Sequence, residues 1–460
     1  MAMAGQLQSI TIQGIHGKKD KIIDAKIRDN TLIIVGENGS GKTTFLRILF
    51  HFLSGRWLAL IQFRFDKITA VMDGKQFTVT RAELTRGLEK LDRHALAGYP
   101  LPLRRRLASM IEAGEAERIP AELERLGRHM RFHSEFFINE PDLFDSDAPI
   151  SPSKNISERI QHLRKTLNAQ VLYLPTFRRI ERELSSIFEG LDPDDLRRKQ
   201  HQIRMPNADD ACIELVEFGM GDVQKAIDKV RENIKEFARE NLNSLTLKYL
   251  GDVVNEVYKQ VGPKQIADAS EDTVRAVLDR IDETILTPLH KEHLFTAINR
   301  ARSAGQPSEH DQIICHYFMK LREFQEALQE REKPISAFCA LCSEYIRDKK
   351  FVYDRATFKF AIHPEAPLEP GQTIELSDLS SGEKQIVSLF SHLYLSAKDR
   401  CFVLIDEPEL SLSVPWQKRF LSDIKKGSFC AGIVAVTHSP FIYDNELRCY
   451  AHSLGEFTKF

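Results

Sequence analysis

The octapeptide GENGSGKT at residues 36–43 fits the pattern G-x-x-x-x-G-K-[ST], which in known folds joins a strand to a helix. Its glycines let the backbone turn tightly, so that main-chain N–H groups can surround the oxygens of a polyphosphate. The lysine brings a compact positive charge to the β- and γ-phosphates, and the last hydroxyl can ligate Mg²⁺. We therefore predict a nucleotide site with these binding residues: Gly36, Asn38, Gly39, Ser40, Gly41, Lys42, Thr43 (also a metal ligand) and Thr44.

The residues on both sides of this loop have the pattern that such a site needs. Residues 31–35 (TLIIV) form a short β-branched run, typical of a buried parallel strand. Phe45, Ile48, Leu49 and Phe52 recur at helical spacing, so a helix should begin at the loop and direct its positive N-terminal end at the phosphates. The alternative is a chance match, which a strand before it and a helix after it argue against.

Length and charge limit the classes of protein to consider. At 460 residues the chain is too long for one compact core, so we expect two lobes. The formal net charge of −2 gives no large positive field that would require nucleic acid as a partner. The basic clusters at residues 104–106 and 197–199 are interpreted as solvated helix faces. We find no signal peptide and no apolar run of membrane-spanning length, and we expect a cytoplasmic protein without a membrane partner.

The seven cysteines do not form the paired framework of a small secreted protein. Cys339 and Cys342 form a C-x-x-C, which is compatible with a zinc site or with a buried helix face. A structural zinc ion needs four ligands, and no second pair at metal-ligand spacing is visible. Because residues 335–346 have an apolar helical pattern, we predict buried helix cysteines.

Near the other end of the chain, a second buried strand pattern finishes in two acidic residues. Residues 401–405 (CFVLI) are followed by Asp406, Glu407 and Pro408. A carboxylate at the tip of such a strand can hold Mg²⁺ beside the phosphate loop, and we assign this role to Asp406. Glu407 is then placed to orient the attacking water as general base. In a chain without the phosphate loop, two solvated acids at a strand end would be the better interpretation.

Two further segments can complete this site. In residues 379–385 (LSSGEKQ), Ser380 and Glu383 have the spacing of a capping box at a helix start, and the Ser-Gly pair offers a hydroxyl and free N–H donors to an anion. Residues 433–436 (IVAV) give a third buried strand, which His438 follows. Alone, this histidine would be an ordinary strand-end residue, but after the third strand it can reach the γ-phosphate.

In four segments, which follow one another in the same order, the chain resembles the ABC-type ATPase head of SMC, RecF and OLD-type proteins. They are residues 36–43, 379–385, 401–407 and 433–438. Residues 379–385 resemble the signature motif, residues 409–413 the D-loop, and His438 the switch histidine. The resemblance implies an α/β fold, namely an ABC-type P-loop ATPase head with a mixed sheet and helices. The chain departs from the OLD-like pattern at Ser413, where histidine is usual, and the glutamine that closes the Mg²⁺ shell is not identified.

The same resemblance implies how the site works. ATP with Mg²⁺ binds between two heads, so that the phosphate loop of one copy faces Ser380, Ser381 and Gly382 of the other, in a two-fold dimer. Glu407 and His438 are the implied catalytic residues. An isolated head lacks donors on the far side of the γ-phosphate, so ATP joins the two heads and hydrolysis releases them.

The order of the motifs predicts that the head is split along the chain. Residues 1–80 form its N-terminal half and residues 351–460 its C-terminal half. Between them, residues 81–350 form a large, mainly helical insertion, interrupted by a head strand near residues 170–180.

Turn and strand signals add detail to this division. A type I′ hairpin is predicted around Asp73 and Gly74, a loop over residues 139–153, and a strand at residues 171–174. The arginines in residues 177–181 (FRRIE) could contact nucleotide or pair with the next helix, and both alternatives stay open.

The insertion itself reads as helical from residue 210 to residue 350. Its breaks are at Gly251, Gly262-Pro263, Pro288 and Gly305–Pro307. Because no unbroken a/d heptads persist, we expect a compact helical lobe for protein contacts rather than a long coiled-coil arm. Residues 351–360 and 373–376 are expected to be strands that lead back into the head.

A closer resemblance bears on partners. Residues 177–181, 216–220 and 222–223, together with the head motifs, resemble the standalone ATPases of bacterial anti-phage systems. Among these the AriA family of PARIS systems is nearest, and the PtuA ATPases of Septu and retron systems share the head. The resemblance implies a homo-oligomeric ATPase scaffold that holds an AriB-like TOPRIM nuclease and releases it when a phage trigger protein is present. Nucleic acid is not required in this scheme.

The C-terminal residues agree with a separate nuclease. Only 22 residues follow His438, too few for the TOPRIM domain that OLD-type nucleases append, so we expect the effector to be another chain. The alternative function is a RecF/SMC-like DNA-repair ATPase that acts on DNA directly, against which the near-neutral charge argues. A transport ATPase is the least favoured class.

Overall fold

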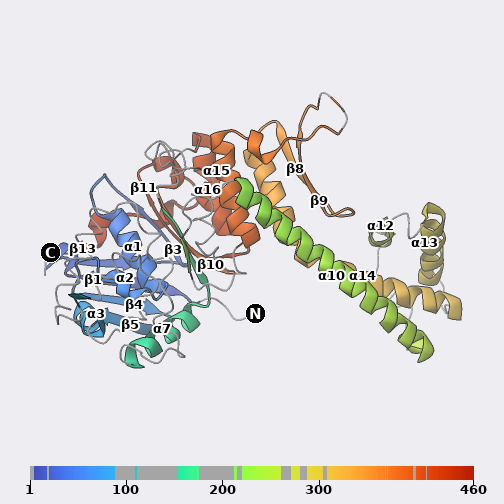
Figure 1. The fold of residues 1–460 in the computed structure, drawn as a ribbon, viewed down its shortest axis with the longest axis horizontal. Coiled ribbons are helices and arrows are strands. Elements are labelled where there is room, and N and C mark those ends of the chain that lie inside the picture. The colour runs from blue at the N-terminus through green and yellow to red at the C-terminus, as the bar shows by residue number, and fades with distance from the viewer. Residues whose placement is uncertain are drawn as a thin grey trace. The chain divides into compact units, whose positions relative to one another are not determined.

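The computed structural model divides into two compact units, residues 1–218 with 397–460, and residues 219–396 (Figure 1). The first unit contains the predicted phosphate loop. The predicted domain boundaries at residues 80 and 350 follow the order of motifs and stay a prediction. The structure describes residues 5–17, 20–88, 109–110, 154–175, 212–214, 220–260, 271–279, 287–303, 308–367, 369, 371–396, 400–410 and 412–459. The sequence predictions for residues 104–106, 139–153, 177–181 and 197–199 lie outside these residues.

A parallel sheet in the first unit brings the strands of the predicted site together. Its order is β12-β3-β11-β10-β6-β7, and every neighbouring pair is parallel. The strands are β3 (Thr31–Val35), β6 (Gln170–Leu174), β7 (Cys212–Glu214), β10 (Cys401–Asp406), β11 (Cys430–Thr437) and β12 (Ala451–Ser453). They confirm the strands predicted at residues 31–35, 171–174, 401–405 and 433–436. The α/β fold class is therefore shown.

The backbone register shows that β3, β11 and β10 end next to one another at the same edge of the sheet. Val35 of β3 lies opposite Thr437 of β11, and Val436 lies opposite Asp406 of β10. Because parallel strands share one carboxyl edge, the loops after β3, β11 and β10 leave the sheet next to one another.

The second sheet of this unit is antiparallel. Its order is β13-β2-β1-β4-β5. Asp73 and Gly74, at the β4–β5 turn, both have left-handed backbones (φ 48° and 72°), which confirms the predicted type I′ hairpin. The strands are β1 (Leu7–Gln13), β2 (Ile22–Lys26), β4 (Lys67–Met72), β5 (Lys75–Thr80) and β13 (Thr458–Lys459).

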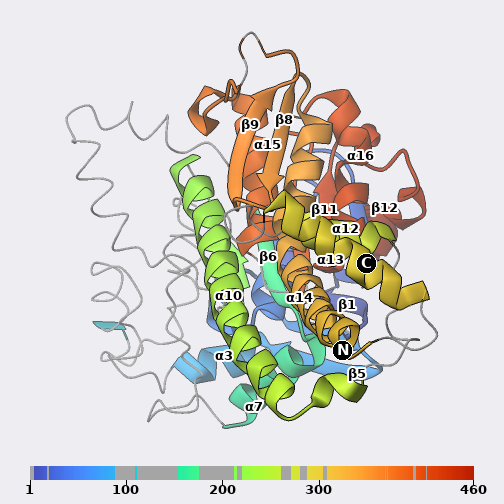
Figure 2. The same ribbon diagram turned by 90° about the vertical axis from the view of Figure 1, so that its right-hand side faces the viewer.

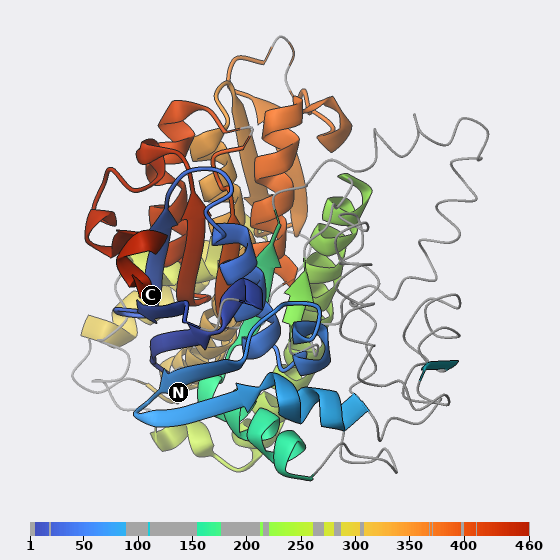
Figure 3. The same cartoon turned by 90° about the vertical axis from the view of Figure 1, so that its left-hand side faces the viewer.

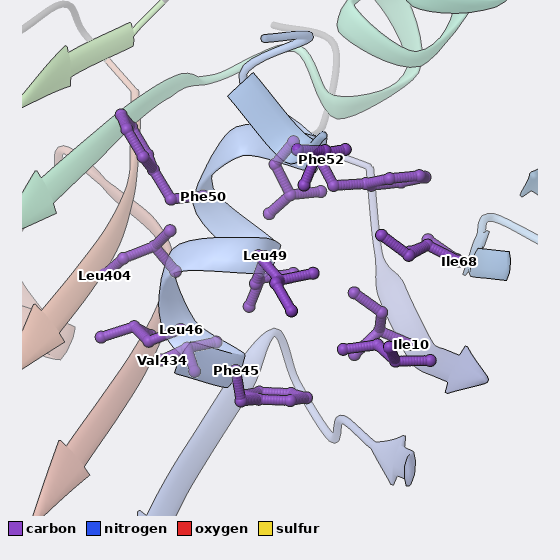
Figure 4. Packing of buried hydrophobic residues seen from close by; sticks show 14 of the residues in the cluster. Ile10, Phe45, Leu46, Leu49, Phe50, Phe52, Ile68, Leu404 and Val434 are labelled. Carbon is purple, nitrogen blue, oxygen red and sulfur yellow. The ribbon is translucent and has the colours of Figure 1, made fainter. Parts of the chain in front are cut away.

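Helix α1 (Lys42–Leu53) is packed between the two sheets (Figures 3 and 4). Figure 4 shows Leu404 and Val434 of the parallel sheet on one side of it, and Ile10 and Ile68 of the antiparallel sheet on the other. A helix that is apolar on nearly all faces belongs in the core, where each large side chain contributes about 1.5–3 kcal/mol of burial free energy. The start of α1 is thereby held firmly beside the ends of β10 and β11.

The described residues of this unit include four further α-helices: α2 (Trp57–Leu60), α3 (Arg81–Leu88), α7 (Lys154–Leu167) and α16 (Val414–Lys426).

The second unit is built on two long helices that lie side by side, α10 (Met220–Val254) and α14 (Glu309–Tyr345) (Figure 2). His316 Nε2 of α14 donates to Asp252 Oδ2 of α10 over 2.9 Å, and the Arg331 guanidinium of α14 lies 4.1 Å from the Phe237 ring centre of α10. Between these two contacts the residue number falls by 15 along α10 (252 to 237) and rises by 15 along α14 (316 to 331). The helices are antiparallel in a continuous register.

The second unit is compact, but two of its helices are longer than the predicted breaks allow. With 35 and 37 residues, α10 and α14 are each about 50 Å long. Gly251 lies inside α10 and Pro334 inside α14, so neither residue ends its helix. The helices are joined by polar and aromatic cross-helix pairs, which a search for apolar heptads does not detect.

Two shorter helices pack against this pair. They are α12 (Glu271–Asp279) and α13 (Pro288–Ser303). A small apolar cluster joins them to α14, and it contains Val274, Val277, Leu278, Ile298, Phe318 and Leu321.

After α14 the second unit continues with a two-stranded antiparallel sheet, β8 (Lys349–Asp354) and β9 (Lys359–Pro364). The single strand expected over residues 351–360 is wrong because the chain turns there. The Asp354 carboxylate accepts bonds from the Ala356 N–H (2.9 Å) and the Thr357 hydroxyl (2.5 Å), which is an aspartate turn. The strand expected over residues 373–376 is also wrong, since that segment is irregular up to the 3₁₀ turn Leu376–Asp378.

The C-x-x-C pair lies on α14, where Cys339 is 4 % exposed and Cys342 is fully buried. The interpretation as buried helix cysteines is confirmed, and burial raises the pKa of the Cys339 thiol to about 12. Within the described parts of the chain, no group of three His, Cys, Asp or Glu side chains could hold a metal ion, and no helix combines the length and apolarity to cross a membrane.

Candidate nucleotide-hydrolysis site

The phosphate loop connects the buried strand β3 to the buried helix α1 while its own residues face solvent. Asn38, Gly39 and Ser40 are exposed. Gly39 and Gly41 have left-handed backbones (φ 80° and 95°), and Gly41 is the N-cap of α1. A side chain would be strained at both positions, and the turn they allow leaves the first N–H groups of α1 at the loop. This is a cradle suited to a polyphosphate.

Lys42 is folded back onto this loop. Its Nζ donates to the carbonyl oxygens of Gly36 (2.7 Å) and Glu37 (2.8 Å), and the residue is only 4 % exposed. Burial lowers the pKa of the ammonium, although the carboxylates of Glu407 and Asp406 favour its charged form. The cation therefore lies at the loop, where phosphate oxygens can replace the two carbonyls.

A hydroxyl and a carboxylate meet where α1 begins. Thr43 Oγ1 donates to Asp406 Oδ1 over 3.1 Å, and Asp406 is 1 % exposed at the end of β10. Both groups offer hard oxygen atoms. Mg²⁺ binds through one or two such protein ligands together with waters and phosphate oxygens, so this pair fits the ion. It is the predicted metal pair, brought together from positions 363 residues apart.

Glu407 has an unusual backbone. Its φ is 50°, in the left-handed region that non-glycine residues rarely adopt, and its N–H donates to the Val436 carbonyl of β11 over 2.8 Å. Burial, with the adjacent Asp406 carboxylate, raises the pKa of Glu407. A carboxyl with a raised pKa is suited to accept a proton from water.

The His438 ring lies between the Glu407 carboxylate and the Lys42 ammonium. Its Nε2 is 3.5 Å from Glu407 Oε1, and its Nδ1 is 3.5 Å from Lys42 Nζ. One edge of the parallel sheet thus gathers five side chains that the sequence marked separately. They are Lys42, Thr43, Asp406, Glu407 and His438.

The predicted signature residues lie in the second unit, at the start of α15 (Ser381–Ser391). The capping box is confirmed: Ser380 Oγ accepts the Glu383 N–H, and Glu383 accepts the Ser380 N–H. The hydroxyl-bearing residues Ser380 and Ser381 are exposed, and Gly382 is half-buried. The roles of these residues, and of Thr44 beside the phosphate loop, stay predictions.

Two charged residues contact the predicted ones: Lys349, which the sequence analysis did not single out, and Glu409, which it gave only as part of the D-loop segment. Lys349 of β8 donates to Glu383 over 2.6 Å and so supports the cap of α15. Although burial opposes it, the bonds from Lys349 and Ser380 lower the pKa of Glu383. Glu409 bonds the loop that carries His438. The sequence signal for Glu409 is a third acid within residues 406–409, but its target lies 28 residues away along the chain.

Comparison with known proteins places this geometry in context. The family model described as an AAA ATPase domain matches residues 6–443. Among curated proteins, none matches the chain. Among solved structures, the chain is similar to the Smc head domain with an extended coiled coil, bound to the C-terminal domain of ScpA, from Pyrococcus furiosus. The two share 13 % identity with a TM-score of 0.32, over 99 % of this chain and 95 % of the other.

Proposed function

Because this chain belongs to the AAA ATPase domain family, we propose that it binds ATP with Mg²⁺ at the carboxyl edge of its parallel sheet and hydrolyses it. Lys42 and the loop N–H groups hold the phosphates, and Thr43 with Asp406 holds the metal ion. Glu407 accepts the proton of the attacking water, and His438 contacts the γ-phosphate. When bound, Mg²⁺ neutralises phosphate charge.

A single observation carries this proposal. Three neighbouring strands, β3, β11 and β10, end at one level, and side chains at or after their ends meet in the pairs Thr43–Asp406 (3.1 Å), Glu407–His438 (3.5 Å) and His438–Lys42 (3.5 Å). Cation, metal ligands, base and histidine are the groups that phosphoryl transfer to water needs.

Nucleotide binding is tested with Lys42→Ala. Loss of a charge-assisted contact of about 1.5–3 kcal/mol predicts an ATP affinity that falls about 10- to 150-fold. Isothermal titration with Mg·ATP gives the dissociation constant. The matched control is Lys26→Ala, which removes an exposed lysine of β2 and should leave the affinity unchanged. Tight ATP binding by Lys42→Ala would refute the assigned loop role.

Hydrolysis is proposed to occur between two copies of the head. Support comes from Ser380 and Ser381, which are exposed at a helix start and can supply anion donors to another copy. Further support comes from Leu410, Val414 and Phe441, large apolar residues in or just after the predicted D-loop and histidine segments that are 40, 43 and 39 % exposed. Such residues become buried when two heads pair.

At the level of the organism, the proposed role is an ATP-switched scaffold of an anti-phage system. It holds a separate TOPRIM-like nuclease and releases it when a phage trigger protein is present. The support is the resemblance of the head motifs and of residues 177–181, 216–220 and 222–223 to AriA-type ATPases.

The second candidate is a RecF/SMC-like ATPase that acts on DNA directly. The antiparallel helix pair α10–α14 favours it, because long paired helices are expected of an SMC-like protein and were not expected here.

Purification of the complex from its native operon distinguishes the two roles. The scaffold predicts a stoichiometric nuclease chain in the mass spectrum of the complex. The DNA ATPase predicts instead duplex binding that weakens with salt, with a linear slope of log affinity against log salt concentration. DNA binding of that kind without a partner chain would overturn the scaffold role.

A further inference from the structure

Glu409 joins two loops of the first unit. Its Oε2 accepts from the Thr437 hydroxyl (2.7 Å), and its Oε1 accepts from the backbone N–H groups of His438 (2.7 Å) and Ser439 (3.2 Å). One carboxylate thus takes donors from three consecutive residues at the end of β11. Such charge-assisted bonds are shorter and stronger than neutral ones.

Gln417 of α16 joins the same two loops. Its Nε2 donates to the carbonyl oxygens of Leu412 (2.9 Å) and Glu409 (3.4 Å), while its Oε1 accepts from the Ser439 hydroxyl (2.7 Å). The segment after Glu407 and the segment around His438 are therefore joined twice, once through Glu409 and once through Gln417.

These bonds act on the backbone that carries the His438 ring. The strand ends at Thr437, so from His438 onward the sheet no longer holds the chain. The N–H groups of His438 and Ser439 are held instead by Glu409, while the ring lies 3.5 Å from Glu407 Oε1 and 3.5 Å from Lys42 Nζ. Without the carboxylate the His438 N–H loses its acceptor, and the Ser439 N–H keeps only its bond to Thr437 Oγ1 (3.0 Å), so the loop has to change to satisfy the His438 N–H.

We propose that Glu409 is a positioning residue that holds His438 at the hydrolysis site and makes Glu409 and Leu412 move together with residues 437–439. A displacement of the D-loop when two heads pair is then passed to the histidine. The inference rests on the proposed function, since it concerns the same hydrolysis. It assigns Glu409 no contact with nucleotide.

The test compares Glu409→Ala with Glu409→Gln in ATP binding and steady-state hydrolysis. Misplacing a group by about 1 Å costs up to about 100-fold in rate, so Glu409→Ala should lower kcat about 10- to 100-fold with little change in ATP affinity. In Glu409→Gln the amide oxygen of the new side chain can still accept both N–H bonds, so this variant should keep most of the rate.

A double-mutant cycle separates positioning from general structural damage. If Glu409 acts through His438, adding Glu409→Ala to His438→Ala causes no further loss of kcat. Independent, multiplicative losses would overturn the proposal. The matched control is Glu83→Ala, which removes a carboxylate that likewise accepts a backbone N–H and a threonine hydroxyl, both of Thr80 (2.9 and 3.0 Å), beside the antiparallel sheet. It should leave kcat unchanged.

If Glu409→Ala folds poorly, hydrogen exchange at the amides after β11 tests the proposal with two more conservative variants. In Glu409→Gln without nucleotide, the amides of His438 and Ser439 should stay protected, whereas in Glu409→Asp, whose shorter side chain cannot reach all three donors, they should exchange faster. Equal protection in wild type and Glu409→Asp would overturn the proposal. If wild type hydrolyses no ATP, the proposed function fails. If His438→Ala is slow while Glu409→Ala matches wild type, only the positioning role fails.

Discussion

At the scale of single residues, the backbone of Glu407 carries the strongest mark of function. A left-handed non-glycine residue costs roughly 1–2 kcal/mol, and residues held this way gather at active sites. The bond from its N–H to Val436 over 2.8 Å keeps it there. This backbone conformation points the Glu407 side chain toward His438.

The first residue-scale prediction concerns this carboxylate. Glu407→Gln should bind ATP as wild type does, but kcat should fall about 10²- to 10⁴-fold because an amide cannot accept the proton of water. Rapid-quench measurement with radiolabelled ATP gives both quantities. A variant that still turns over at the wild-type rate would exclude Glu407 as the base.

The pH dependence follows from the same group. Burial and Asp406 raise the pKa of Glu407, and only its deprotonated form is active. The value of kcat/KM should therefore fall as pH decreases through this raised pKa, above the ordinary value of 4.5. Rates measured from about pH 4 to pH 9 locate the acid limb, and a limb at or below the ordinary value would contradict the assignment.

Sequence predicts some residues of the site and not others for a physical reason. Lys42 and Thr43 belong to a loop whose chemistry requires them, and Asp406 follows an unmistakable buried strand. Glu409 could not be predicted, because its acceptor role depends on two loops that the sheet brings together. Lys349 was missed likewise, since its partner Glu383 lies 34 residues farther along the chain.

At the scale of elements, the buried strands of the parallel sheet were predictable, whereas the segments at residues 351–360 and 373–376 and the long helices were not. Runs such as those of β3 and β10 are apolar because the strands are covered on both faces, and this leaves a continuous signal. The pairing of α10 with α14 leaves no such signal. It depends on cross-helix pairs such as Asp252–His316, whose members are 64 residues apart.

The element-scale prediction concerns this pair. Asp252→Ala leaves His316, which is 6 % exposed, without its carboxylate partner, and should destabilise the helix pair by about 1–3 kcal/mol. Urea unfolding followed by circular dichroism measures the loss. The control Glu330→Ala removes a solvent-exposed ion pair with Lys333 on the same helix and should cost at most about 1 kcal/mol. Equal losses would mean that Asp252 does not join the two helices.

At the scale of the whole molecule, the prediction concerns pairing of two copies. In a Glu407→Gln background, ATP should produce dimers, and adding Gly382→Gln should keep the protein monomeric while its ATP affinity is retained. Gly382 lies in the first turn of α15, where glutamine favours the helix by up to about 1 kcal/mol, so folding is preserved. Light scattering behind a sizing column gives the mass.

Gly221→Gln is the control for this experiment. Gly221 is the second residue of its helix, as Gly382 is, and a Cβ there meets nothing within 4 Å. This variant should dimerise normally. Monomers of Glu407→Gln at saturating Mg·ATP would overturn the dimer itself.

The strand at the centre of the pocket is also among the last to be translated. β3 ends at Val35 and β11 begins at Cys430, 395 residues later (430 − 35), yet β11 lies between β3 and β10. On a ribosome adding about 5–20 residues per second, β3 waits roughly 20 to 80 seconds for this neighbour. During that time the edge of β3 that β11 later covers is open to wrong pairing, so a nascent chain cannot assemble its pocket until synthesis is nearly over.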